Sequence, residues 1–491
     1  MKGWVLDVVI QKIGIYRVIP FGLVGVYLRL FGTAGIRMRY PGEINAILAY
    51  KIGLAVSKLG LSRRAYIVHD SRTTSPLITL STAAGLMSGG VDVYLLGLAP
   101  TPLAGYAARK RRSLGVSVTA SHNPPEYNGL KFYDTGGFEF TRDLERLVEE
   151  YVDKGVQPLD WEMVGGFAYG TELVDDYIEE LYELARPSRK TWIPRVVVDL
   201  ANGVAGSITP LLLRRVGAIP LTINANPDGF FPVRAPEPRK DVLEPYLKFY
   251  AEANPAVILV HDGDADRLSV LDVEEGFIRQ DRIIAFFIDE LARGASGRVV
   301  VSVDTGRVID EVAERHGLKV ERYILGKTHE RVKEDPGVVV AAEPWKLIYP
   351  RWGPWVDGIL QAALIGKVVV EEGKRFAKIL EERGIRDYPW DRRSFRIKPA
   401  EKLKTIFQDL EAALRNLLGE PIAENRVDGV RYDYDDGSWI LIRVSGTEPK
   451  IRVYMESLSR DKIRGMVDRV EREVRRAVEV NNAQIEEVTI G

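Results

Sequence analysis

Short apolar runs alternate with longer amphipathic stretches along most of this chain. The runs at 65–69, 91–96, 256–260 and 268–273 each end at a polar or glycine-containing turn, and 76–87 has the length and apolar content of a buried helix. Continuous apolar runs are typical of strands buried in a sheet, with helices covering its faces. The pattern therefore predicts strand–turn–helix units, which build an α/β protein.

One of these units is repeated. Arg195-Val-Val-Val-Asp-Leu-Ala-Asn-Gly203 matches Arg298-Val-Val-Val-Ser-Val-Asp-Thr-Gly306, with the arginine, three valines and glycine in register. Each copy precedes an amphipathic stretch, at 208–216 and 308–316, that a glycine closes. With the earlier unit, this repetition indicates three related α/β units in tandem.

The pattern changes after residue 390. A strand at 394–397, a long helix at 401–418, alternating strands within 429–455 and a closing helix at 460–478 indicate an α+β unit. The predicted fold class is α/β, with three tandem α/β domains of mixed sheets and a C-terminal α+β domain. The expected ranges are 1–29 as an N-terminal extension of unknown role, then 30–165, 166–275, 276–390 and 391–491.

Length and composition narrow the possible functions. A chain of 491 residues with 46% hydrophobic and 28% charged residues can bury several cores. A net charge of −1 without a long basic run gives no footprint for nucleic acid, so we expect a small ligand. The absence of cysteine excludes disulfides, thiolate metal sites and cysteine nucleophiles.

The N-terminal segment carries an apolar run at 18–28 that is too short to span a bilayer. Asp7 and Lys12 interrupt the segment, and no small-residue cleavage site of a signal peptide follows. We therefore expect a cytoplasmic enzyme without a membrane partner. The oligomeric state cannot be inferred from the sequence.

A first chemical centre lies at 119–133, Thr-Ala-Ser-His-Asn-Pro-Pro-Glu-Tyr-Asn-Gly-Leu-Lys-Phe-Tyr. Its two prolines fix φ and keep the chain out of a helix, so Ser121 lies on a stiff loop beside His122. Asn128-Gly129 is a turn signal, which we expect to fold the chain back and bring the Lys131 ammonium toward the Ser121 hydroxyl. The alternative is an ordinary surface loop and hairpin.

A second centre follows the apolar strand at 256–260. Asp262, Asp264 and Asp266 stand at alternate positions of a tight loop, where their oxygens can converge on one hard cation. An EF-hand loop is excluded, because its required glycine and glutamate are replaced by Arg267 and Val273. A solvated acidic turn is the other alternative.

A third centre lies between two strands of the last unit. In Arg443-Val-Ser-Gly-Thr-Glu-Pro-Lys-Ile-Arg452, hydroxyls, backbone N–H groups around Gly446 and two guanidiniums can form a phosphate cradle. Gly326-Lys-Thr328 is not a P-loop, because Glu321 stands where that motif needs glycine.

These motifs closely resemble, in type and order, those of the α-D-phosphohexomutases, the family of phosphoglucomutase, phosphomannomutase and phosphoglucosamine mutase. T-A-S-H-N-P, D-G-D-A-D-R and R-x-S-G-T-E-P-x-x-R match its serine, metal and phosphate loops, and Leu30 to Arg37 resembles its F-G-T-x-G-I-R opening. The resemblance covers about residues 30 to 480. It implies four domains around a central cleft.

The resemblance also implies site roles. Ser121 would carry a phosphoryl group and, with Asp262, Asp264 and Asp266, would bind Mg²⁺. The implied catalytic group comprises Ser121, Lys131, His122, Arg37 and Arg267, with Lys131 as proton carrier. The implied phosphate-binding residues are Arg443, Ser445, Gly446, Thr447 and Arg452.

The sugar-reading loop departs from the family pattern. G-E-x-S-G-H is replaced by Ala341-Ala-Glu-Pro-Trp-Lys346, in which only the glutamate survives. Glu343 can accept hydrogen bonds from two adjacent sugar hydroxyls, and Lys346 can meet a phosphate. A site reduced to this glutamate should accept both glucose and mannose, which differ only at C2.

The expected activity is interconversion of hexose 1-phosphate and hexose 6-phosphate through a phosphoserine and a hexose 1,6-bisphosphate. Phosphoglucosamine mutase is the alternative. A phosphatase and a sugar-phosphate-binding protein without turnover are rivals. The binding protein would need neither Ser121 nor Lys131, and the phosphatase would not need the distal phosphate cradle.

Overall fold

The first sheet of the protein carries the serine loop. We describe a computed structural model in which residues 29–32, 34–446 and 448–490 are placed; residues 1–28 of the expected extension and Thr447 of the phosphate loop lie outside them. The six strands of the sheet run in the order β1-β5-β4-β2-β3-β6. Its elements are β1 Ile36–Arg39, α2 Ala46–Ser57, β2 Arg64–His69, α3 Ser75–Ser88, β3 Asp92–Leu98, α4 Thr101–Arg111, β4 Leu114–Val118, β5 Tyr127–Tyr133, α5 Arg142–Lys154 and β6 Phe167–Tyr169. Because β6 pairs with β3, the sheet extends past residue 165.

The second unit positions the three aspartates at the end of a central strand. Its sheet has the order β11-β10-β9-β7-β8, and β9 and β10 form the hairpin whose loop holds them. Val196, Val197 and Val198 of the repeated motif are buried in β7. Its elements are α6 Glu172–Ala185, β7 Arg195–Asp199, α7 Thr209–Val216, β8 Ile219–Ile223, α8 Lys240–Leu243, α9 Leu247–Ala251, β9 Val257–His261, β10 Leu268–Asp272 and β11 Gly276–Phe277.

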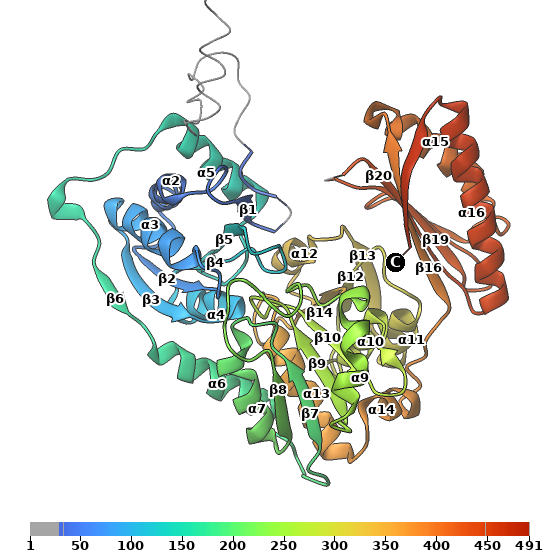
Figure 1. The fold of residues 1–491 in the computed structure, drawn as a ribbon, viewed down its shortest axis with the longest axis horizontal. Helices are drawn as coiled ribbons and strands as arrows, with labels where there is room; N and C mark the ends of the chain where they lie inside the picture. Colours follow the sequence, from blue (N-terminus) through green and yellow to red (C-terminus); the bar gives the residue numbers. More distant parts are fainter. Residues whose placement is uncertain (1–28, 33, 447, 491) are drawn as a thin grey trace, which may run out of the picture.

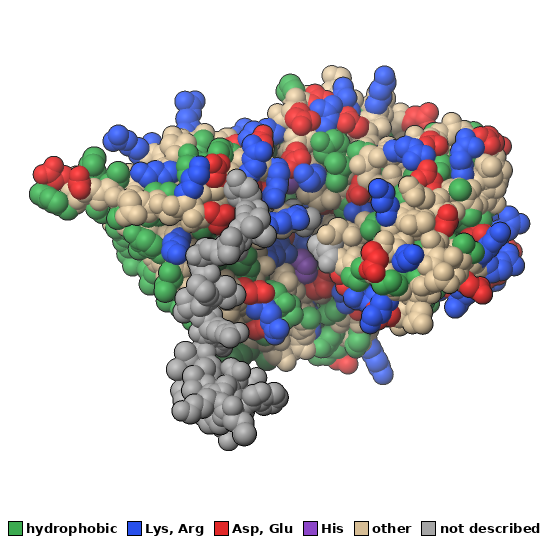
Figure 2. Space-filling view, turned by 90° about the horizontal axis from the view of Figure 1, so that it is seen from above, with side chains coloured by type: hydrophobic (Ala, Val, Ile, Leu, Met, Phe, Trp, Pro, Cys, Tyr) green, Lys and Arg blue, Asp and Glu red, His purple; other side chains and the backbone are tan. Residues whose placement is uncertain are grey.

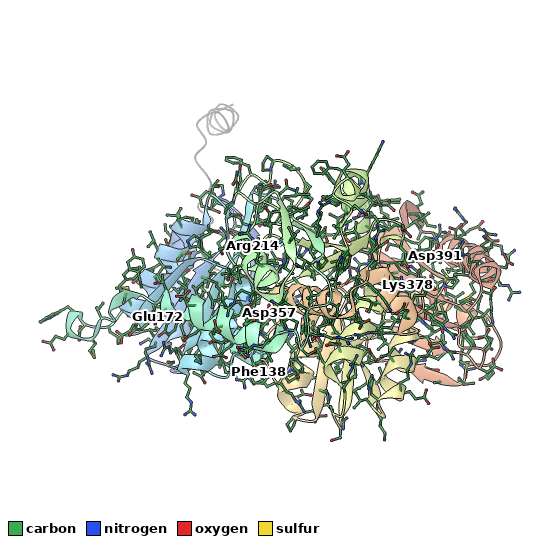
Figure 3. The ribbon with its side chains drawn as sticks, turned by 90° about the horizontal axis from the view of Figure 1, so that it is seen from below. Phe138, Glu172, Arg214, Asp357, Lys378 and Asp391 are labelled. Carbon is green, nitrogen blue, oxygen red and sulfur yellow. The ribbon has the colours of Figure 1, made fainter. Side chains whose placement is uncertain are left out.

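The third unit repeats the arrangement with the sheet order β13-β12-β14-β15. Its long helix α13 packs against α6 and α7 of the second unit, and Asp357, which caps α13, lies near the middle of the molecule (Figure 3). Its elements are α10 Gln280–Leu291, β12 Arg298–Ser302, α11 Val308–Arg315, β13 Lys319–Tyr323, α12 Thr328–Glu334, β14 Val338–Glu343, β15 Lys346–Ile348, α13 Gly358–Glu372 and α14 Phe376–Glu382.

The fourth unit is the predicted α+β domain, with two helices on a mainly antiparallel sheet of order β17-β18-β19-β20-β16-β21. The last strand, β21, has no counterpart in the sequence prediction. Its elements are β16 Trp390–Lys398, α15 Leu403–Arg415, β17 Ala423–Asn425, β18 Val430–Asp433, β19 Trp439–Val444, β20 Lys450–Glu456, α16 Arg460–Val480 and β21 Gln484–Ile490.

The four units follow one another in an arc (Figure 1), and the surface is hollowed near the middle, where charged side chains and a histidine gather (Figure 2). One large cluster of buried apolar residues spans the first three units, and the first unit has a second cluster of its own. The fourth unit has a separate cluster, and a small one joins Val303 to Trp439. This arrangement confirms the expected fold class. Among the described residues, no helix combines the length and apolar character needed to cross a bilayer.

Candidate active site

The serine loop is held in a strained conformation by its neighbours. Ser121 has φ of 49°, in the left-handed region that residues with a side chain rarely adopt. Its amide donates to Thr119 Oγ1 at 2.7 Å. The buried Arg72 guanidinium donates to four carbonyl oxygens of the loop, those of Ser121 (2.9 Å), Asn123 (2.6 Å), Pro124 (2.5 Å) and Tyr127 (3.0 Å). Such bonding fixes the loop in one shape.

The expected turn at Asn128-Gly129 is wrong, because both residues lie inside strand β5. The Asn128 side chain donates to the hydroxyls of Thr74 and Ser75. A Cβ at position 129 would stand only 1.8 Å from the Ile36 carbonyl oxygen, so glycine is needed for close strand approach rather than for a turn. The chain reverses before β5 instead, and the antiparallel pairing brings Lys131 opposite Ser117.

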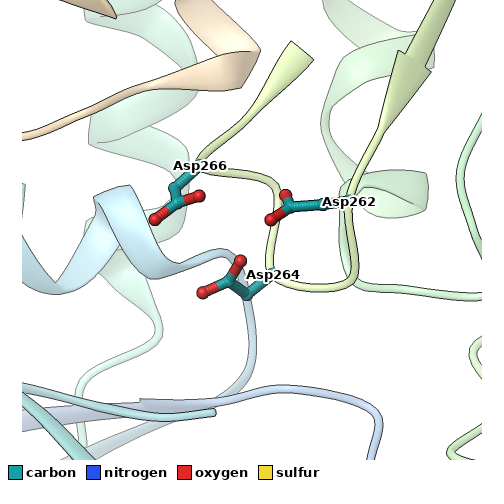
Figure 4. A group of neighbouring side chains, drawn as sticks. All are labelled: Asp262, Asp264 and Asp266. Carbon is teal, nitrogen blue, oxygen red and sulfur yellow. The ribbon is translucent and has the colours of Figure 1, made fainter. Parts of the chain in front are cut away.

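The three aspartates converge as predicted. Asp262, Asp264 and Asp266 are buried, and one carboxylate oxygen of each lies within 4.8 Å of the others. Figure 4 shows their carboxylates turned toward a common space. The Ser121 hydroxyl donates to Asp262 Oδ2 at 2.7 Å. Thr101, at the start of α4, donates its hydroxyl to Asp264 Oδ2 at 2.7 Å, so the first unit holds the loop of the second.

The electrostatics of this cluster favour a cation. Burial and the neighbouring carboxylates raise the pKa of Asp262 well above its ordinary value, and burial and Asp266 raise the pKa of Asp264. Asp264 Oδ1 and Asp266 Oδ1 are buried and accept no hydrogen bond from any described residue. A hard divalent ion such as Mg²⁺ would fit this set of oxygens and offset the repulsion among them.

Lys131 is a buried cation between two carboxylates. Its Nζ lies 3.1 Å from Asp266 Oδ2 and 3.3 Å from Glu139 Oε1. Burial opposes the charged form of the lysine, but Glu139 and Asp266 together hold its pKa well above the ordinary value. Burial also opposes charge on Asp266, yet Lys131 and Arg267 lower the pKa of that carboxyl. Lys131 is therefore charged at neutral pH and can act as a proton donor.

A cationic corner lies beside the serine. Arg267 Nε lies 4.0 Å from oxygens of both Asp262 and Asp266. Arg37 Nη1 lies 3.4 Å from His122 Nδ1, and the Ser121 hydroxyl lies 3.3 Å from the same nitrogen. Burial and then the charges of Arg267 and Arg37 lower the pKa of His122, which makes it a neutral hydrogen-bonding group at pH 7. The two guanidiniums beside the serine could donate charge-assisted hydrogen bonds to a phosphoryl group on Ser121.

The phosphate loop sets two arginines opposite each other. Arg443 in β19 and Arg452 in β20 are paired across the antiparallel ladder. Like charges in this register repel unless an anion lies between them. Arg443 Nη2 binds Asp428 at 2.8 Å, but its Nε and Nη1, and Nε of Arg452, are buried without a described partner. Between the two strands, Ser445 N donates to the Lys450 carbonyl, and Gly446 is open to solvent.

The sugar loop is a two-residue hairpin between β14 and β15. Glu343 pairs with Lys346 across it, and Trp345 has φ of 68°. Glu343 Oε1 already accepts from the amides of Gly326 (3.0 Å) and Thr328 (3.2 Å) and from the Thr328 hydroxyl (2.9 Å). Only Oε2, which faces Lys346 Nζ at 3.5 Å, remains for a ligand. Glu343 therefore has only one oxygen, rather than the expected two, with which to accept hydrogen bonds from sugar hydroxyls.

Several residues of this site were missed by sequence reasoning. Arg72 lies in the polar segment Asp70-Ser-Arg72 that follows the apolar run at 65–69, and Thr101 follows Pro100; neither segment carries a recognisable chemical motif. Glu139 and Asp428 lack any motif of their own, and each is recognised only by the cation that it binds. The electrostatic influence of Lys346 on both His122 and Asp266 connects the sugar loop with the serine and metal loops.

Comparisons with known proteins identify the family. Models of the four phosphoglucomutase/phosphomannomutase domains match residues 28–158 (α/β/α domain I), 175–276 (domain II), 279–384 (domain III) and 396–473 (C-terminal domain). The phosphopentomutase of Thermococcus kodakarensis is 37% identical over 432 residues, which cover 88% of this chain and 94% of that protein.

A probable phosphoglucosamine mutase of Methanosphaera stadtmanae is 33% identical over 440 residues, 88% of this chain and 95% of that protein. The crystal structure of a phosphoglucomutase/phosphomannomutase family protein from Burkholderia thailandensis has a TM-score of 0.80 at 23% identity, covering 93% of this chain and 99% of that chain. That likeness confirms the fold. The chain belongs to the phosphoglucomutase/phosphomannomutase family and is a mutase of the phosphohexomutase type.

Proposed function

We propose that this protein is a Mg²⁺-dependent mutase that interconverts the 1-phosphates and 6-phosphates of glucose and mannose through a phosphoserine at Ser121. The observation that carries the proposal is the 2.7 Å hydrogen bond from the Ser121 hydroxyl to Asp262 within the buried aspartate cluster. A nucleophile at a cation site and beside two arginines suits phosphoryl transfer, which needs positioning and charge neutralisation. A bisphosphorylated hexose would be the intermediate.

In the proposed step the bond between phosphorus and Ser121 Oγ breaks while a bond from a sugar hydroxyl oxygen to phosphorus forms. Ser121 Oγ takes a proton from the charged Lys131, and the neutral amine so formed takes the proton that the sugar hydroxyl loses, so that Lys131 ends the step charged again. Bound Mg²⁺ would neutralise charge on the transferring group. Arg37 and Arg267 would orient its oxygens, and the loop from Arg443 to Arg452 would hold the distal phosphate.

The experiment has two parts. Intact-mass measurement of the purified protein should find one phosphate, absent from Ser121→Ala. A panel of glucose, mannose and glucosamine 1-phosphates should then give kcat/KM values that are similar for the first two sugars. Lys346 would repel the ammonium of the amino sugar by about 1 kcal/mol. A tenfold preference for glucosamine 1-phosphate, about 1.4 kcal/mol, would favour the phosphoglucosamine mutase alternative.

Ribose phosphate is a second candidate substrate. The phosphopentomutase relative shares 37% identity with the chain. In addition, Glu343 Oε1 is occupied and Oε2 is shared with Lys346, so the carboxylate offers a ligand at most one oxygen, which suits a sugar with fewer ring hydroxyls to read. Ribose 1-phosphate therefore belongs in the same panel, and a kcat/KM tenfold above that of every hexose phosphate would assign the protein to pentose phosphates.

A further inference from the structure

A carboxylate of the repeated segment 298–306, which belongs to none of the chemical centres described above, lies at the edge of the sheet that carries the sugar loop. Strands β12 and β14 are parallel, and Val301 pairs with Ala342, so the next residues, Ser302 and Glu343, end the two strands side by side. Asp304 follows two residues after Ser302, on the turn into α11. In α/β sheets the crevice beyond the carboxyl ends of the strands is where ligands bind.

The backbone on both sides of Asp304 is fixed. Arg431 of the fourth unit is almost fully buried, and its Nη1 donates to the carbonyl oxygens of Val303 at 3.0 Å and Thr305 at 2.6 Å. The Thr305 hydroxyl donates to the Ser302 carbonyl at 2.8 Å. Three buried hydrogen bonds therefore hold the turn, and the position of the Asp304 Cα is set before any ligand arrives.

Only one oxygen of the Asp304 carboxylate accepts a hydrogen bond from a described residue. Ser302 Oγ donates to Oδ1 at 2.6 Å. No described residue donates to Oδ2, and the side chain is partly exposed. The charges that act on Asp304 come from three separate elements: Arg443 of the phosphate loop, Arg392 of β16 and Glu343 of the sugar loop. The Asp304 carboxylate therefore lies within electrostatic range of both loops, at the strand end that adjoins Glu343.

We propose that Asp304 is a specificity-determining residue whose Oδ2 accepts a hydrogen bond from a ring hydroxyl of the bound sugar phosphate. The inference rests on the proposed function, since it adds a contact to the same substrate. A carboxylate would repel the phosphate group of the substrate, which the arginines of the phosphate loop would bind instead. An ionised carboxylate is an acceptor only, so its natural partner here is a hydroxyl. Asp304 supplies the second acceptor that Glu343, with Oε1 occupied, does not.

The test compares Asp304→Ala, Asp304→Asn and the matched control Asp461→Asn, whose side chain is 94% exposed on α16. We expect kcat/KM of Asp304→Ala to fall about tenfold to hundredfold, the usual effect of losing a hydrogen bond to a charged group. Asp304→Asn keeps one acceptor oxygen and the shape of the side chain, so it should recover part of the loss and should melt like the wild type. The control should equal the wild type.

The decisive substrates are the 2-, 3- and 4-deoxy analogues of the sugar phosphate that the wild type turns over. With the analogue that lacks the contacted hydroxyl, the ratio of wild-type to Asp304→Ala kcat/KM should fall to about one. Phosphate occupancy of Ser121 and the Mg²⁺ dependence of the rate should be unchanged in every Asp304 variant. A loss below twofold in Asp304→Ala, or an equal loss on all three analogues, would overturn the inference.

Failure of the proposed function would look different. If wild-type protein turns over no sugar phosphate, the proposed mutase substrates are wrong, and calorimetric binding of glucose 1-phosphate then tests the contact alone. A Kd that is at least tenfold weaker in Asp304→Ala would support the contact. An equal Kd, or no binding by the wild type, would refute it.

Discussion

Replacement of Arg72 by lysine tests whether the serine loop is held in its reactive shape by one side chain. Arg72 donates to four loop carbonyls from two terminal nitrogens, and its Nε binds Asp70 Oδ2 at 3.0 Å. An ammonium has three donors on one atom, so at least one carbonyl, and by geometry about two, would lose a partner. At about 1–3 kcal/mol for each buried group, the loss is about 2–6 kcal/mol.

Part of that free energy now keeps Ser121 in the left-handed region, a conformation that costs about 1–3 kcal/mol. Without its support we expect the loop to relax and the hydroxyl to leave Asp262. Misplacement of a reacting group by about 1 Å can cost about 10²-fold in rate. Arg72→Lys should therefore lower kcat by about 10²-fold and unfold at a lower denaturant concentration than the wild type.

The assay is kcat at saturating Mg²⁺ and substrate, with chemical denaturation and amide exchange over residues 119–127. Arg39→Lys is the matched control, because Arg39 binds Glu126 of the same loop at 3.1 Å but its side chain is 60% exposed. That variant should stay within about twofold of the wild type. If Arg72→Lys keeps kcat within threefold and the same unfolding midpoint, the guanidinium does not shape the loop.

Three further predictions concern the cluster and its support. Ser121→Ala should abolish most turnover and the mass of one phosphate while the protein stays folded, because it removes only the group that carries the phosphoryl; near wild-type kcat would exclude the phosphoserine. Asp264→Asn should raise the Mg²⁺ concentration for half-maximal rate by removing one carboxylate, while its amide oxygen can still accept from Thr101; an unchanged Mg²⁺ dependence would mean that the loop is only a turn. The buried pair of Asp199 and Arg234 should make stability depend on pH. Burial opposes charge on Asp199, but Arg234 lowers its pKa below the unfolded value of about 3.9, so this stabilisation is complete above about pH 4 and is lost as pH falls through the lower folded value. Urea unfolding should show the loss, and Arg234→Met should both remove it and destabilise the protein by about 3–5 kcal/mol; equal pH profiles would contradict the assignment.

The features that could be predicted from the sequence are the strands and loops that a local pattern of residues determines. The repeated Arg-Val-Val-Val runs form the buried strands β7 and β12, because a continuous apolar run is stable only where both faces of the strand are covered. The aspartates at alternate positions converged because the tight loop between β9 and β10 leaves their carboxylates little freedom. Motif-bearing loops with constrained backbones are therefore readable without a structure.

Contacts between residues that are far apart in the chain could not be predicted from the sequence. Asn128-Gly129 has the composition of a hairpin turn, but the surrounding strands use the glycine for close approach and the asparagine for buried hydrogen bonds. Glu343 survives from the family pattern, yet the loop at 326–328 occupies one of its oxygens. Asp304 lies in the repeated segment 298–306 but in no chemical motif, and only the pairing of β12 with β14 brings it to the sugar loop.

The separate apolar core of the fourth unit affects how the protein unfolds. Tyr66 of the first unit, Val198 of the second and Val301 of the third share one cluster, which joins these units although the first also has a cluster of its own. Most of the fourth unit's core is separate and meets the third unit only in the small cluster around Val303. Elements that share a core melt as one cooperative unit, and elements with a separate core can melt alone. A calorimetric scan should then resolve two transitions, and the smaller one would belong to the phosphate-holding domain. Substitutions inside that domain's own core should then lower the smaller transition and leave the larger one in place.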